Sequence, residues 1–229
     1  MKLRDRLSAV KREFESGAPP YNATAEIIAL QHRATNELIT SGAADRALKV
    51  GDRAPIFALQ SESGAVVRSD VLLARGPLVA SFYRGVWCPY CNLELEALQE
   101  ALPEIEARGA TLVAVSPQTS ANSRNSKRKT GAVFDILSDP SNAIARRFGL
   151  AHRLPDYLIA GVHKPLGADL TIFNRDDRWE LPMPARYIIE PSGEITYAAV
   201  HPDYTTRPEP EDLYETLGRL AQKNQPETV

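Results

Sequence analysis

Apolar residues recur at helical spacing along the first 48 residues of the chain. Leu3, Leu7, Val10 and Phe14 are separated by four, three and four positions, so a single helix face carries them all. The stretch 16–20, with Gly and two Pro, ends that helix, and a second helix is predicted over residues 22–41 with Gly42 as its stop. We expect residues 1–48 to form a helical extension that packs on its own domain or across a homodimer.

From residue 49 to residue 223, short apolar runs alternate with helical periods. Strands are predicted over residues 56–59, 77–83, 111–115 and 133–137, with a hairpin over 186–190 and 194–200. Helices are predicted over residues 92–108, 120–130 and 213–220, and Pro103 predicts a kink or a break in the first of them. This order predicts one α/β domain, a three-layer sandwich around a mixed central sheet.

Two segments lie outside this regular pattern. Residues 150–183 are irregular, with prolines at positions 155, 165 and 182, and indicate either an insertion with local structure or a lid over a pocket. Residues 224–229 are predicted to form a frayed tail.

Composition and charge narrow the classes of partner. The chain has 229 residues, 43% of them hydrophobic and 24% charged, which is typical of a soluble globular protein. A net charge of −2 gives no reason to expect binding to nucleic acid or to an anionic membrane. The first residues lack the apolar core of a secretion signal, and no apolar run reaches the length of a membrane span. We therefore expect a cytoplasmic protein.

Both cysteines of the chain, Cys88 and Cys91, lie at the turn between the strand over 77–83 and the helix over 92–108. Helix N-terminal N–H groups favour a thiolate, and lowering a thiol pKa from about 8.5 to about 7 stabilises the thiolate by about 2 kcal/mol. Pro89 suits the first helical position, where its missing N–H costs nothing. Because the second thiol can close a disulfide once the first is oxidised, this spacing favours dithiol redox chemistry.

Two other interpretations of the cysteine pair compete with redox chemistry. A CxxC pair is half of a structural zinc site, but the four histidines of the chain are scattered singly and supply no second half. Two inert core cysteines are the other alternative. The run Trp-Cys-Pro-Tyr-Cys argues against it, and we expect a site without metal or cofactor.

Several further runs agree with one known family. They are Val-Gly-Asp-Arg-Ala-Pro-Ile-Phe-Ala-Leu at 50–59, Ser-Phe-Tyr at 81–83, Val-Ala-Val-Ser at 113–116, Leu-Ser-Asp at 137–139 and Tyr-Ile-Ile-Glu-Pro-Ser-Gly at 187–193. With the order of elements, they resemble the thioredoxin-fold superfamily and, within it, the alkyl hydroperoxide reductase/thiol-specific antioxidant family. The chain looks like a peroxiredoxin-like branch that carries a CxxC, over residues 48–222.

The resemblance implies a thiol-dependent peroxidase and gives roles to the residues of the turn. Family members have Phe-Tyr-Pro, a Thr or Ser four residues after the Pro, and the peroxidatic Cys three further on. Here that pattern places Cys91 at the peroxidatic position, Cys88 at the Thr position and Arg84 at the Pro position. The reverse order, with Cys88 attacking first, stays open because a thiol at the helix start is expected to be more exposed. The implied partners are a peroxide substrate and, as reductant, a thioredoxin-like protein or a low-molecular-weight thiol.

Other positions depart from the family pattern. The place of the family's activating Arg is taken by Pro184, which instead fits the cis-Pro that thioredoxins hold against their disulfide. Arg84 and Arg186 are each expected either to stabilise a thiolate or peroxide oxygen or to form an ion pair. Trp87 and Tyr90 are expected at the rim of the site.

These departures keep two alternatives to a peroxidase open. One is a thioredoxin-like protein-disulfide reductase, and the other is a non-enzymatic binding module that uses residues 1–48 and 150–183 on a partner.

Overall fold

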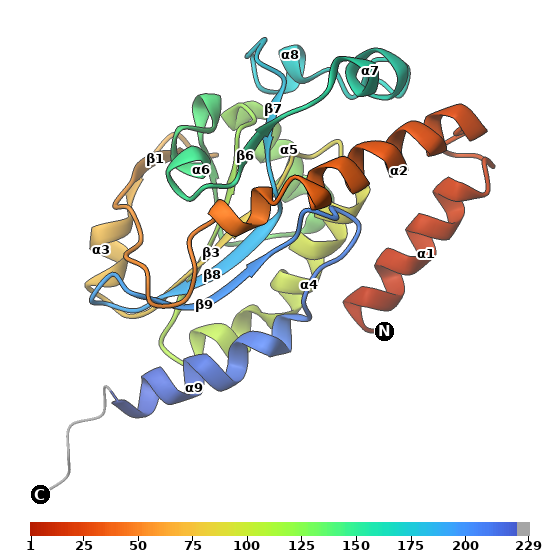
Figure 1. The fold of residues 1–229 in the computed structure, drawn as a ribbon. Helices are drawn as coiled ribbons and strands as arrows, with labels where there is room; N and C mark the ends of the chain where they lie inside the picture. The colour runs from red at the N-terminus through yellow and green to blue at the C-terminus, as the bar shows by residue number, and fades with distance from the viewer. Residues whose placement is uncertain (224–229) are drawn as a thin grey trace, which may run out of the picture.

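The computed structural model describes residues 1–223, and the expected frayed tail over 224–229 lies outside the described residues. Within them the chain folds around one mixed sheet of seven strands with helices on both faces (Figure 1). In spatial order the strands are β2 (Val66–Arg68), β1 (Ala58–Ser61), β5 (Asp135–Ser138), β4 (Thr111–Ser116), β3 (Leu78–Phe82), β8 (Ala185–Ile189) and β9 (Ile195–Val200). Strands β3, β4 and β5 are parallel, while β8 and β1 pair antiparallel on either side of them. The predicted sandwich with a mixed sheet is confirmed.

Side chains of the central strand β3 alternate between the two faces of the sheet, as the pleat of a strand requires. Val79 joins the core under α4 (Pro89–Glu106), whereas Leu78, Ala80 and Phe82 join the core on the opposite face. The first face is covered by α4 together with α1 (Leu3–Glu15) and α9 (Tyr214–Lys223), and α5 (Ser120–Thr130) packs beside α4. The second face is covered by α3 (Ser69–Leu73) and α6 (Ala143–Arg147). The domain also contains the short 3₁₀ helices η1 (Ala43–Arg46), η2 (Pro140–Asn142) and η4 (Pro210–Leu213).

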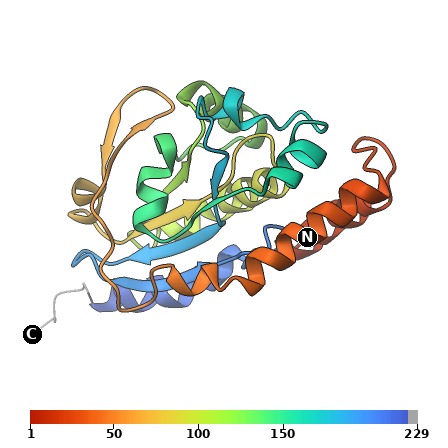
Figure 2. The ribbon, with the colours of Figure 1, turned by 45° about the horizontal axis from the view of Figure 1, so that its top comes forward.

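The N-terminal extension consists of α1 and α2 (Ala25–Thr40), which lie side by side along one edge of the molecule (Figures 1 and 2). Thr24 caps α2 by accepting the Ile27 N–H at 3.3 Å, and Gly42 follows the helix in the left-handed conformation with φ +65°. Leu3 and Leu7 of α1 are buried against α4, so the extension packs on its own domain.

The irregular segment 150–183 has local structure of its own. It contains β6 (Ala151–Arg153), α7 (Asp156–Leu158), the π-helical turn η3 (Ile159–His163), α8 (Leu170–Phe173) and β7 (Glu180–Pro182). Strands β6 and β7 pair antiparallel, and Leu158, Val162 and Trp179 form a small core between the helices. Because Leu30 of α2 and Trp87 pack against this core, the segment joins the extension to the cysteine turn.

The prolines at positions 103 and 184 behave differently from expectation. Helix α4 runs through Pro103 to Glu106, so of the kink or break predicted there the break is wrong. The expected cis bond before Pro184 is wrong: among residues 1–223 the cis peptide is Pro19–Pro20. Pro184 lies in an extended link from β7 to β8, held by Met183 N–H donating to Leu150 O and by Pro184 O accepting His201 N–H.

Two smaller findings complete the fold. The strand predicted from residue 133 begins at Asp135, since Val133 is exposed and its N–H donates to the Gln99 side chain at 2.7 Å. Of the helices in the described part of the chain, none combines the length and apolarity that crossing a membrane requires.

Candidate active site

The cysteine turn begins where β3 ends and closes into the first turn of α4. Cys88 is the N-cap of α4 and Pro89 is its first residue, as the sequence predicts. Gly85 has φ +148°, and a Cβ at this position would lie 2.7 Å from Trp87 Nε1. Glycine at position 85 therefore lets the chain turn sharply and leaves room for the indole.

Buried amide side chains fix the turn. Gln118 Oε1 accepts the Val86 N–H at 2.9 Å, and Asn92 Nδ2 donates to Val86 O at 2.9 Å. Gln118 Nε2 donates in turn to Tyr83 Oη at 2.7 Å. Because Gln118 and Asn92 are buried, the position of the cysteines is set by the protein interior and not by solvent.

Both cysteines are free thiols and both are buried, Cys88 to 1% and Cys91 to 0% exposure. Cys88, expected to be the more exposed thiol, belongs to a buried cluster against which Trp87 and Tyr204 pack. Cys88 nevertheless lines a cavity of about 220 Å³, whereas Cys91 is not among the residues that line it. A small molecule in this inner cavity meets Cys88 first.

The two thiols have opposite acid–base behaviour. Burial raises the pKa of Cys88, but the hydrogen bond from Cys91 and the charges of Arg84 and Arg207 outweigh it and lower that pKa to about 6. Burial, the hydrogen bond to Cys88 and the charge of Cys88 together raise the pKa of Cys91 well above its ordinary value. Near pH 7, Cys88 is therefore a thiolate and Cys91 a thiol. This is the reverse of the order that the family pattern implies for these two positions.

Arg84 supplies a cation at the cysteine turn. Its side chain is 5% exposed and lies between two aromatic rings, 4.7 Å from the Trp87 centroid and 4.1 Å from the Tyr204 centroid. Within residues 1–223 it makes no ion pair with a carboxylate, so the interpretation of Arg84 as an ion-pair residue is wrong. The aromatic sandwich holds the guanidinium where its charge acts on Cys88.

Arg186 forms an ion pair, the second of the two roles expected for it. It is buried, and its Nη2 lies 3.0 Å from Glu94 Oε1, so it forms a structural ion pair. The second oxygen of Glu94 binds Arg207 Nε at 2.5 Å, and Arg207 Nη2 lies 3.6 Å from Cys91 Sγ. Burial raises the pKa of Glu94, but Arg207 and Arg186 outweigh it and keep that pKa below its ordinary value.

Glu94 and Arg207 were not predicted from the sequence. Glu94 gives a signal in retrospect, because it is an acid three residues after Cys91, on the face of the helix that also carries Leu95 and Leu98. Arg207 lies in the loop after β9, where no periodic pattern marks it.

The inner cavity over Cys88 is walled by segments that are distant in sequence. The extension contributes Phe14, Tyr21 and Gln31; the segment 150–183 contributes Val162, His163 and Leu166; the turn contributes Arg84, Trp87 and Tyr90. Trp87 and Tyr90, expected at the rim of the site, are thus among the residues that line the cavity over Cys88.

His163 is a polar group in this wall. Its Nδ1 donates to Ala168 O at 3.2 Å, which leaves Nε2 as an acceptor without a partner in the described residues. Burial and the charge of Arg84 lower the pKa of His163 to about 3, so the ring is neutral.

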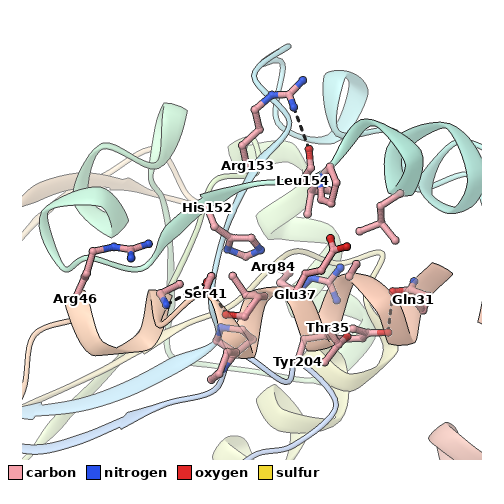
Figure 3. Close-up of a pocket in the computed structure, with 17 residues that line it drawn as sticks. Gln31, Thr35, Glu37, Ser41, Arg46, Arg84, His152, Arg153, Leu154 and Tyr204 are labelled. Carbon is pink, nitrogen blue, oxygen red and sulfur yellow. Dashed lines mark hydrogen bonds between the residues drawn. The ribbon is translucent and has the colours of Figure 1, made fainter. Parts of the chain in front are cut away.

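A second, outer cavity of about 290 Å³ lies beside the first and shares Arg84, Gln31 and Tyr204 with it. Figure 3 shows its walls: α2 supplies Gln31, Thr35 and Glu37, and His152 reaches in from β6. Pro184 lines this outer cavity and not the one over Cys88. The structure thus brings Cys88, Cys91, Arg84, Trp87 and Tyr90 together, whereas neither Pro184 nor Arg186 lines the cavity over Cys88.

Comparison with known proteins identifies the family. The model of the AhpC/TSA family matches residues 50–198. Peroxiredoxin Q, chloroplastic, of Oryza sativa subsp. japonica is 27% identical over 100 residues, which cover 44% of this chain and 46% of that protein. The match thus spans about half the length of that relative.

Solved structures agree in fold. Peroxidoxin BcpB from Mycobacterium tuberculosis has a TM-score of 0.58 and 18% identity, over 78% of this chain and 99% of that one. Bacterioferritin comigratory protein of Xanthomonas campestris, studied for its alkyl peroxide reduction activity, has a TM-score of 0.56 and 17% identity, over 76% of this chain and 100% of that one. Because the family model matches more than half of the chain, the chain belongs to the AhpC/TSA family.

Proposed function

We propose that the protein is a thiol-dependent peroxidase that reduces hydrogen peroxide or alkyl hydroperoxides through a Cys88–Cys91 dithiol–disulfide cycle. The observation that carries the proposal is a buried cysteine with a pKa lowered to about 6, beside Arg84, at the wall of a cavity of about 220 Å³. The AhpC/TSA family, and relatives described as peroxiredoxins, support the same activity.

In the first half of the cycle the Cys88 thiolate attacks the terminal oxygen of the hydroperoxide. An S–O bond forms, the O–O bond breaks, and Cys88 becomes a sulfenic acid while the alkoxide leaves and takes up a proton. Arg84 is placed to stabilise negative charge on the departing oxygen, because its guanidinium lines the cavity that Cys88 lines.

In the second half Cys91 resolves the sulfenic acid. The Cys91 sulfur attacks Cys88 Sγ, an S–S bond forms, and the hydroxyl group leaves as water with the thiol proton of Cys91. Once Cys88 is a sulfenic acid, its negative charge no longer opposes deprotonation of Cys91, and Arg207 at 3.6 Å favours the thiolate. Two electrons from a thiol reductant then restore both cysteines.

The protein-disulfide reductase is the weaker alternative. A protein substrate needs an exposed first thiol and benefits from the cis-Pro of thioredoxins, whereas Cys88 is buried and the bond before Pro184 is trans. No particular observation favours the non-enzymatic binding module.

Further features of the protein complete the proposal. Its reductant is a thioredoxin-like protein or a low-molecular-weight thiol, and two cysteines in CxxC spacing suit the cytoplasm. The helical extension is compatible with a homodimer in which the exposed face of α2 contacts a second copy of the chain.

Stopped-flow oxidation of the reduced protein by hydrogen peroxide and by cumene hydroperoxide tests the activity. We expect wild type and Cys91→Ser to react much faster than free cysteine, and Cys88→Ser to react no faster than free cysteine. Wild-type rates equal to those of free cysteine with both peroxides would exclude a peroxidase.

A further inference from the structure

The charge of Arg84 lacks a permanent partner in the described residues. The guanidinium is buried between Trp87 and Tyr204, without a carboxylate in ion-pair contact. A buried charge without a partner is costly. In the reduced protein, the Cys88 thiolate is the negative group that compensates Arg84.

Oxidation removes this compensation. In the Cys88–Cys91 disulfide neither sulfur carries a charge, so Arg84 becomes an uncompensated cation in the wall shared by the inner and outer cavities. The outer cavity adds Arg46, together with Arg153, which is paired with Asp156. Among the described residues that line the outer cavity, the acidic one is Glu37. Its carboxylate already accepts a hydrogen bond from Arg33 Nε at 2.8 Å. The oxidised site therefore attracts an anion.

Access to the disulfide is the second observation. Both cysteines are buried, and Cys88 lies in the wall of a cavity of about 220 Å³ that is partly open to solvent and is also lined by Phe14, Tyr21, Val162 and Leu166. A small molecule enters such a space, whereas the thiol of a folded protein reaches Cys88 only if these walls move.

We propose that a low-molecular-weight thiol bearing a carboxylate, bound through Arg84, reduces the Cys88–Cys91 disulfide in preference to a thioredoxin-like protein. This inference rests on the peroxidase cycle proposed above, which generates the disulfide. It chooses between the two classes of reductant by the charge of the site and by the burial of its two cysteines.

The exchange proceeds in two balanced steps. The thiolate of one small molecule attacks Cys88 Sγ, the bond to Cys91 breaks, and a mixed disulfide forms while Cys91 leaves as a thiolate and takes up a proton. Arg207, 3.6 Å from Cys91 Sγ, stabilises that leaving group. A second thiol attacks the small-molecule sulfur, which releases a small-molecule disulfide and restores the Cys88 thiolate. Two thiols are oxidised for each protein disulfide reduced.

The charge of Arg84 makes the affinity for an anion depend on the redox state of the cysteines. When reduction restores the Cys88 thiolate, the thiolate again compensates Arg84, and the anionic product binds less tightly. We therefore expect S-methylglutathione, an unreactive anionic probe, to bind the oxidised protein at least about tenfold more tightly than the reduced protein. Titration calorimetry on the two forms measures this ratio.

The kinetic test starts from protein oxidised with diamide, so that it does not depend on peroxidase activity. Reduction by glutathione is compared with reduction by its diethyl ester at equal thiolate concentration, and with reduction by a bacterial thioredoxin. We expect glutathione to be at least about tenfold faster than the ester. We expect thioredoxin at micromolar concentration to be slower than glutathione at millimolar concentration.

Variants separate the charge of Arg84 from its packing. Arg84→Gln is expected to abolish the preference for glutathione over its ester, and Arg84→Lys to retain it. Arg68→Gln is the matched control, because Arg68 is an exposed arginine of the edge strand β2 that pairs with Asp70. This variant is expected to leave the preference unchanged. Equal rates for glutathione and its ester with wild type, or faster reduction by thioredoxin, overturn the proposal whether or not peroxides react with Cys88.

Discussion

Cys88 and Cys91 share a helix N-terminus, yet their surroundings give them different protonation states. The dipole of α4 acts on both, so it does not distinguish them. The hydrogen bond from Cys91 to Cys88 does, because it lowers the pKa of Cys88 and raises that of Cys91, whereas Arg84 and Arg207 lower both. The sequence shows the pair and its redox class but not this division, because the hydrogen bond depends on how the two thiols are packed.

The first prediction concerns the pH dependence of Cys88. Since its pKa lies at about 6, alkylation by iodoacetamide is expected to speed up as pH rises through 6 and to level off above about pH 7. Burial and Arg84 lower the pKa values of His152 and His163 to about 4 and about 3, so neither ring adds a second step between pH 5 and 8. In Arg84→Gln the midpoint is expected to move upward, and an unchanged midpoint would remove Arg84 from this role.

The second prediction concerns Glu94, the buried carboxylate between two arginines. Glu94→Gln leaves Arg186 and Arg207 without their counter-charge, so we expect a loss of about 3–5 kcal/mol in the free energy of unfolding. Urea denaturation measures the loss. Glu104→Gln on the same helix removes only an exposed pair with Arg108 and is expected to cost at most about 1 kcal/mol. Equal losses in the two variants would contradict the buried network.

At the scale of elements, the regular strands and helices are predicted well where apolar periodicity is strong. Strand β3 and helix α4 are found where the pattern places them, since nearly every inward position is apolar. The start of β5 differs from the prediction for a local reason, because Val133 is exposed and its N–H is bonded to the side chain of Gln99. The turn between β3 and α4 depends on Gln118, which is distant in sequence, so its shape does not follow from the local pattern.

The third prediction tests how that turn is held. Gly85→Ala places a Cβ 2.7 Å from Trp87 Nε1 at φ +148°, so we expect a loss of stability of about 1–3 kcal/mol and a slower reaction of Cys88 with peroxide. Gly51→Ala is the control, because Gly51 also has positive φ, +93°, but its Cβ would meet nothing within 4 Å. Gly51→Ala is expected to leave the peroxide rate unchanged, and the same loss of rate in both variants would show that strain alone is responsible.

At the scale of the whole molecule, the candidate active site is lined by segments outside the central strands and helices. The sequence left open whether residues 150–183 form an insertion or a lid over a pocket and what residues 1–48 contact, because neither segment carries a motif that points to the cysteines. Leu30 of α2 packs against the apolar core of the segment 150–183, and both segments line the cavity over Cys88. Which side chains meet across these distances is set by tertiary packing, which periodicity does not encode.

The fourth prediction follows from the packing of the extension on α4. Leu7→Ala removes a buried side chain from this interface and is expected to cost about 2–5 kcal/mol. It is also expected to raise the labelling of Cys88 by fluorescein maleimide relative to iodoacetamide, because a loosened wall admits the bulkier reagent. Ile39→Ala, at a position 46% exposed, is the control and is expected to change neither quantity. An unchanged labelling ratio in Leu7→Ala would mean that the extension does not limit access.

The central claim is that Cys88, and not Cys91, meets the peroxide. Sulfenic acid trapping with dimedone after one equivalent of hydrogen peroxide, followed by mass spectrometry of Cys91→Ser and Cys88→Ser, tests it directly. The account predicts a dimedone adduct on Cys88 in Cys91→Ser and none on Cys91 in Cys88→Ser. An adduct on Cys91 in Cys88→Ser, with Cys88 unlabelled in Cys91→Ser, would contradict it.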